Sequence, residues 1–125
     1  MAYIYTTHLT SAEKQQFHEI LSKKTVKLDT CTIWLGIKTS AGYVMIRTHF
    51  RGKRIKLLAH CLLFFLHHPN VTMSKNLHMS HICHNKACIE ILHLSLETVS
   101  INNKRQICCN MGECTGHYDF PKCIL

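Results

Sequence analysis

Three side chains that bind soft metals stand at even intervals in the second half of the chain, as Cys83-x4-Cys88-x4-His93. Cysteine and histidine at such spacing are typical zinc ligands, and a structural zinc site needs four donors in a tetrahedron. The fourth ligand must therefore come from elsewhere. We predict that Cys31 supplies it, because it directly precedes the apolar run Ile33-Trp34-Leu35 and could fix that segment to the later loop.

A second set of ligands follows near the end of the sequence, as Cys108-x5-Cys114-x2-His117-x5-Cys123. Cys109 competes with Cys108 for the first position, and the residues alone leave this choice open. Free cysteines at this density would oxidise readily, so a second zinc site is the better interpretation. Structural zinc contributes on the order of 10 kcal/mol or more to the folding of small modules. A chain of 125 residues, with its modest core, needs such a source of stability.

The overall charge predicts a polyanionic partner. The sequence has 15 Lys and Arg against 7 Asp and Glu, which gives a formal net charge of +8. A membrane is not expected, because the apolar run Leu57 to Leu66 contains His60 and is far shorter than the roughly 20 residues that span a bilayer. The segment Met1 to Thr10 lacks the apolar stretch of a signal peptide. We expect an intracellular protein in a reducing compartment, nuclear or cytoplasmic, and not a secreted one.

The elements that position these ligands indicate a single α+β domain over residues 1–125. Residues 1–29 are predicted as a helix, which the capping box Thr10 to Glu13 opens and which ends near Ser22, and a basic connector. Residues 30–76 form a β-rich region and a buried helix, Leu58 to His67, with His60 as a core residue. Residues 77–107 are predicted as strand, ligand-bearing loop, strand and helix, with the helix over Thr98 to Ile107. Residues 108–125 hold the second zinc site in a tail of little regular structure.

A hairpin between the turns at Gly42 and Gly52 alternates apolar and basic residues. Val44, Ile46 and Phe50 fall on one face. The other face is basic, and a two-stranded ribbon of this kind fits the major groove of DNA. The basic residues of this hairpin are Arg47, His49, Arg51, Lys53, Arg54 and Lys56, and the family resemblance described next implies that they contact DNA.

The order His81-x-Cys83-x4-Cys88-x4-His93, followed by Asn102 and the second cysteine cluster, resembles the His-Cys box homing endonucleases. These enzymes belong to the ββα-metal, or His-Me finger, nuclease superfamily. Upstream, Cys31-x-x-Trp34 and the basic hairpin resemble the region that precedes the box in this family. The similarity extends from about Cys31 to Cys123, and the fold that it implies is a small zinc-stabilised ββα-metal finger with flanking helices.

The resemblance implies a metal-dependent endonuclease that hydrolyses phosphodiester bonds of double-stranded DNA. His81 would be the general base and Asn102 would hold a catalytic Mg²⁺, with two further zinc ions in structural sites. Asn103 points about 100° away around the helix, so it cannot share this role. Continuing the family's register selects Cys108 over Cys109. Arg47 would also reach the scissile phosphate or contact the DNA backbone only.

Two other expectations concern the mode of action. The same scaffold serves as a DNA-binding module without catalysis in Smad transcription factors, which is the alternative function; such a module needs neither His81 nor Asn102. Family members can dimerise through a tail beyond the second zinc site, and here two residues follow Cys123. A homodimer is therefore possible but is not predicted by that route.

Overall fold

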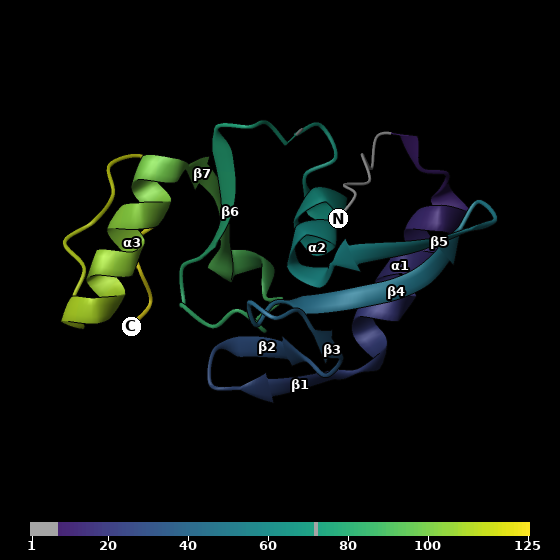
Figure 1. Cartoon of the computed structure of the whole chain (residues 1–125), viewed down its shortest axis with the longest axis horizontal. Coiled ribbons are helices and arrows are strands. Elements are labelled where there is room, and N and C mark those ends of the chain that lie inside the picture. Colours follow the sequence, from purple (N-terminus) through teal and green to yellow (C-terminus); the bar gives the residue numbers. More distant parts are fainter. Residues whose placement is uncertain (1–7, 72) are drawn as a thin grey trace.

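The structure is a computed structural model that describes residues 8–71 and 73–125 (Figure 1). It has the predicted mixed α+β architecture, with short antiparallel sheets between helices. In chain order the elements are α1 (Ser11–Lys23), β1 (Thr25–Leu28), β2 (Cys31–Trp34), β3 (Ile37–Lys38), β4 (Val44–Phe50), β5 (Lys53–Leu58), α2 (Ala59–His67), β6 (Leu77–His81), η2 (Ile91–His93), β7 (Leu94–Thr98) and α3 (Val99–Met111).

Side-chain caps begin the first and last helices. At α1 the Thr10 hydroxyl accepts the Glu13 N–H, while the Glu13 carboxylate accepts the Thr10 N–H, so the predicted capping box is confirmed. At α3 the Thr98 hydroxyl accepts the N–H of Ile101. Gly112 ends this helix with φ 75°, a left-handed conformation that glycine adopts without strain.

Three antiparallel pairings organise the strands. β1 pairs with β2, β4 lies between β3 and β5, and β6 pairs with β7. The β4–β5 ribbon and α1 lie at one end of the molecule, while β6, β7 and α3 lie at the other (Figure 1). The predicted catalytic His81 is the last residue of β6, opposite Leu94 of β7.

Two apolar clusters hold these elements together. The larger one packs Phe17 and Leu21 of α1 against Val44 and Ile46 of β4 and against Leu62 of α2. The smaller one joins α2 to β6 and β7 and is formed by the buried residues Cys61, Phe64, Phe65, Met79 and Leu94. Because α2 contributes to both clusters, it joins the hairpin region to the β6–β7 unit.

Two sequence predictions were wrong in their boundaries. The segment after α1 was predicted as a connector, but Thr25–Leu28 is a strand whose four residues all pair with β2. The last helix was predicted to end at Ile107, and it continues to Met111. In the described part of the chain no helix combines the length and the apolar character that crossing a bilayer requires.

Candidate metal centres and active-site cavity

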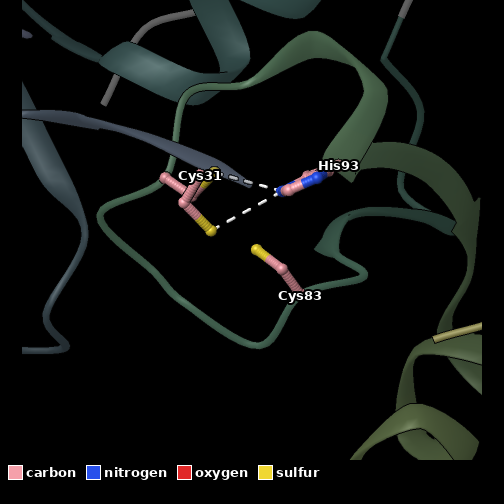
Figure 2. A group of neighbouring side chains, drawn as sticks. Cys31, Cys83 and His93 are labelled. Carbon is pink, nitrogen blue, oxygen red and sulfur yellow. Dashed lines mark hydrogen bonds between the residues drawn. The ribbon is translucent and has the colours of Figure 1, made fainter. Parts of the chain in front are cut away.

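The first ligand cluster gathers Cys31, Cys83, Cys88 and His93, whose ligand atoms all lie within 4.8 Å of one another. Figure 2 shows Cys31, Cys83 and His93 directed toward one point from β2, the loop after β6 and η2. The His93 Nδ1 atom lies 3.6 Å from the Cys31 sulfur and 3.5 Å from the Cys88 sulfur. Tetrahedral zinc with ordinary Zn–S and Zn–N bonds separates S and N by about 3.6 Å. The donor set and its spacing therefore fit zinc.

Backbone pairing brings Cys31 to the later loop. Ile33 of β2 forms an isolated antiparallel bridge with Cys88. The N–H of Ile89 donates to the Thr32 carbonyl at 2.7 Å, and that of Trp34 donates to the Ala87 carbonyl. Hydrogen bonding from the Cys83 thiol and from the Glu90 backbone N–H also lowers the pKa of Cys88, against the effect of burial. The thiolate is the form that binds zinc, so this environment favours metal binding.

The second cluster gathers Cys108, Cys114, His117 and Cys123. The His117 Nε2 atom lies 3.6, 3.3 and 3.5 Å from the sulfurs of Cys108, Cys114 and Cys123 respectively. These distances again fit a Cys3His zinc site. Cys109 lies outside the cluster with its side chain exposed, because neighbouring residues on a helix point in different directions.

His81 is buried, and its ring is held by one well-formed hydrogen bond. Its Nε2 atom lies 3.0 Å from the backbone carbonyl oxygen of Cys88. A carbonyl only accepts, so Nε2 must carry the proton. In the neutral ring this leaves the lone pair on Nδ1. Burial lowers the pKa of His81 to about 4, against the raising effect of this hydrogen bond, so the neutral form dominates at pH 7.

Two aromatic rings pack around His81. The His60 ring lies 4.5 Å from it between centroids, and the Tyr43 ring lies 5.9 Å from it. His60 is buried, as predicted for a core residue, and burial lowers its pKa to about 3. The contact with His81 was not predicted, because nothing local in the sequence relates α2 to the end of β6. His60 therefore belongs to the surroundings of the site as well as to the core.

Asn102 and His81 line the same cavity. The cavity has a volume of about 280 Å³, and the residues that line it are Tyr43, Met79, Ser80, His81, His84, Lys86, Asn102, Arg105, Gln106 and Cys109. The Asn102 oxygen accepts a hydrogen bond from the Ser80 hydroxyl at 2.6 Å, and its nitrogen donates to His78 Nδ1 at 3.2 Å. These two bonds fix the orientation of the amide. Asn103 is exposed and does not line this cavity.

The basic hairpin face carries four of the six predicted DNA contacts. In the β4–β5 register Arg47 pairs with Lys56 and His49 pairs with Arg54, and all four side chains are exposed. They line a groove of about 440 Å³ together with Thr48 and Ile55. Arg47 lines this groove and a neighbouring one but not the cavity of His81. The structure therefore does not bring Arg47 to the predicted catalytic pair.

The other two predicted contacts lie differently. Arg51 lies in the turn with φ 50°, and its guanidinium forms an ion pair of 2.9 Å with Glu13 of α1. This ion pair lowers the pKa of Glu13 to about 2. Lys53 pairs with Phe50 and shares the strand face of Ile55 and Leu57, because side chains alternate along a strand. We therefore leave Arg51 and Lys53 out of the basic face.

A buried ion pair links the cavity to the second cluster. Arg105 of α3 binds the Glu97 carboxylate through two nitrogens, and both side chains are almost fully buried. The same guanidinium donates to the Cys123 sulfur at 3.3 Å and to the Pro121 carbonyl at 2.7 Å. Sequence reasoning missed this pair. Its only sequence signal was an acidic residue at the end of a strand and an arginine two turns into the next helix.

Comparison with known proteins assigns the family. A family model described as the zinc-binding loop region of homing endonuclease matches residues 30–120. The chain belongs to this family. The match covers both ligand clusters except Cys123, and it agrees with the resemblance found in the sequence. Searches of curated proteins and of solved structures found no match. Membership of a homing endonuclease family indicates a nuclease with two sites that could bind zinc.

Proposed function

We propose that this homing endonuclease relative is a metal-dependent endonuclease that hydrolyses phosphodiester bonds of double-stranded DNA. One observation carries the proposal: His81 and Asn102, which the family pattern pairs as base and metal ligand, line one cavity. They lie 21 positions apart in the sequence and on different elements, so composition alone does not bring them together. A non-catalytic DNA-binding module would not need this arrangement.

His81 acts as the general base in this proposal. Its Nε2–H donates to the Cys88 carbonyl, so Nδ1 accepts the proton of the attacking water. The carbonyl oxygen then stabilises the positive charge that the ring acquires. Because Cys88 also belongs to the first cluster, a zinc ion held by that cluster would fix the segment whose carbonyl orients the base.

Asn102 would hold the catalytic Mg²⁺ through its side-chain oxygen. This oxygen has two lone pairs, so the hydrogen bond from Ser80 leaves one available. An ion bound there supplies Lewis-acid stabilisation of the phosphate and of the leaving 3′ oxygen. Ser80 and His78 keep the amide in one orientation, which places the oxygen before DNA arrives.

The exposed face formed by Arg47, His49, Arg54 and Lys56 is the proposed DNA contact. In a two-stranded ribbon these side chains project from one side, and a ribbon of this width enters the major groove. The two zinc ions have a structural role: each closes a ligand set that is complete with four protein donors, which leaves no open position for a substrate.

The test measures nicking and linearisation of supercoiled plasmid with and without Mg²⁺, after the zinc content has been determined. Wild type is expected to cleave only with the divalent ion. His81→Ala and Asn102→Ala are expected to cleave at least about 100-fold more slowly while binding DNA within about threefold of wild type. Asn103→Ala and His18→Ala, at exposed positions outside the cavity, serve as matched controls.

Three outcomes distinguish the alternatives. Salt-sensitive DNA binding without cleavage by wild type indicates the Smad-like binding module. Equal loss of binding and cleavage in a folded His81→Ala protein contradicts the assignment of the base. A DNA affinity that does not fall with rising salt contradicts phosphate contacts by the hairpin, because such contacts release counterions.

A further inference from the structure

The proposed reaction requires a positive charge in the cavity of His81 and Asn102, and Arg47, which was predicted to supply it, does not line this cavity. Negative charge builds on the non-bridging phosphate oxygens as water attacks, and a fixed cation in the active site lowers the barrier. Arg47 was predicted for this role. However, Arg47 lines the grooves of the hairpin and not the cavity of His81 and Asn102.

Two permanently charged cations line the cavity among the described residues, Arg105 and Lys86. Arg105 is 2% exposed, and both carboxylate oxygens of Glu97 bind it. The same guanidinium also donates to the Cys123 sulfur and to the Pro121 carbonyl. Its charge is thus neutralised by Glu97 and its side chain is almost fully buried, so it is not available to a phosphate that enters from solvent.

Lys86, in contrast to Arg105, is exposed and its charge is not neutralised. Its side chain is exposed, and within residues 8–71 and 73–125 it has no carboxylate partner. The ammonium group donates to the Ala41 carbonyl at 2.9 Å and lies 5.2 Å from the centre of the Tyr43 ring. An ammonium group has three N–H donors, so two remain for a phosphate. Neither of its contacts neutralises its charge.

Hydrogen bonds fix the backbone of the loop that carries Lys86. It lies between the first-cluster ligands Cys83 and Cys88. The Asn85 side chain accepts the Ala87 N–H at 3.0 Å, and the Asn85 carbonyl accepts the Cys88 N–H at 3.0 Å. The first cluster therefore positions this loop at the rim of the cavity, while the four-carbon side chain keeps the reach that a phosphate contact requires.

We propose that Lys86 is a catalytic residue that binds the scissile phosphate and stabilises its charge in the transition state, in the role predicted for Arg47. This inference rests on the proposed nuclease function. A water oxygen bonds to phosphorus as the bond from phosphorus to the 3′ oxygen breaks. His81 Nδ1 accepts the water proton, and the 3′ oxygen takes a proton from solvent. Lys86 donates hydrogen bonds to a non-bridging oxygen and keeps its own protons throughout.

The test is single-turnover cleavage at saturating DNA, with the dissociation constant measured separately. Lys86→Gln is expected to slow cleavage about 100-fold, as the loss of one transition-state donor does in other enzymes, with affinity within about threefold of wild type. Lys86→Arg, which keeps the charge, is expected to stay within about tenfold. Lys75→Gln is the matched control, because Lys75 is an exposed lysine that lines neither the cavity nor the hairpin groove: its affinity and its rate at saturation should both stay within about threefold of wild type.

Zinc content is measured for each variant, and Lys86→Met is a second neutral substitution should Lys86→Gln lose zinc. Wild-type rates in a neutral, zinc-replete variant overturn the inference, and so does a loss confined to affinity. If His81→Ala is inactive while Lys86→Gln cleaves normally, the proposed function stands and this inference fails. If wild type itself does not cleave, both fail together.

Discussion

The two ligand clusters contain the same donors, three cysteines and one histidine, but close very different lengths of chain. In the first cluster Cys31 and His93 are separated by 62 positions, and β2 must be brought to a loop that forms much later in the sequence. In the second cluster His117 lies 9 positions from Cys108 and 6 from Cys123. Closing the longer loop costs about 2 kcal/mol more in chain entropy.

This difference assigns the clusters different tasks. Backbone bonds between β2 and the loop surround the first cluster, and its Cys88 carbonyl holds His81. The second cluster ties the chain end to α3, with Arg105 and Glu97 as its connection to β7. The first cluster thus organises the global fold and the base, whereas the second stabilises the helix that carries Asn102.

The largest effect expected from this comparison is on stability. Cys88→Ser should give unfolded or insoluble protein, because it removes a buried ligand from the cluster on which the global fold depends. Cys114→Ser should remain folded from α1 to β7, with one zinc per chain and weak or no cleavage. Zinc content, circular dichroism and solubility distinguish the two variants. A soluble Cys88→Ser protein with two zinc ions would contradict the division of tasks.

A smaller loss is expected at the ion pair between β7 and α3. Arg105→Met leaves the Glu97 carboxylate buried without its partner, which typically destabilises a protein by about 3–5 kcal/mol. Combining Arg105→Met with Glu97→Leu should recover part of this loss, because the uncompensated charge is gone. Denaturant unfolding of both single variants and of the double variant measures the coupling. Additive losses would show that the pair does not connect the second cluster to the sheet.

The smallest effect separates two adjacent cysteines. Cys108→Ser should lose the zinc of the second cluster, whereas Cys109→Ser should keep two zinc ions and change stability by less than about 0.5 kcal/mol, as exposed substitutions usually do. Zinc release on titration with a chelator checks both variants. Retention of two zinc ions by Cys108→Ser together with loss of one by Cys109→Ser would reverse the ligand assignment.

Local patterns made much of the fold predictable. The capping box at Thr10 and the cap at Thr98 are encoded within a few residues, so the starts of α1 and α3 were predicted correctly. The alternation along β4 and β5 predicted the hairpin and most of its basic face. The spacing of the cysteines and histidines predicted both ligand clusters, because zinc limits which donors can meet.

Other features depend on contacts between distant segments. β1 is only four residues long and all four are exposed, and its pairing with β2 makes it a strand. The alternation of apolar and basic residues along the hairpin places Arg51 on the basic face. In the structure, Arg51 lies in the turn and its guanidinium forms an ion pair with Glu13 of α1 instead. The ring contact of His60 with His81 and the burial of Glu97 with Arg105 likewise join elements that no local pattern relates.

The sequence by itself determined the ligand types, their order and the helix and hairpin signals, because these depend on side-chain chemistry and on neighbours within a few residues. Only the tertiary structure decided which cations face the cavity: it placed Arg47 on the hairpin, neutralised Arg105 with Glu97 and left Lys86 at the rim. The physical reason is that the charge available to a substrate depends on burial and on partners distant in sequence, and neither can be read from spacing along the chain.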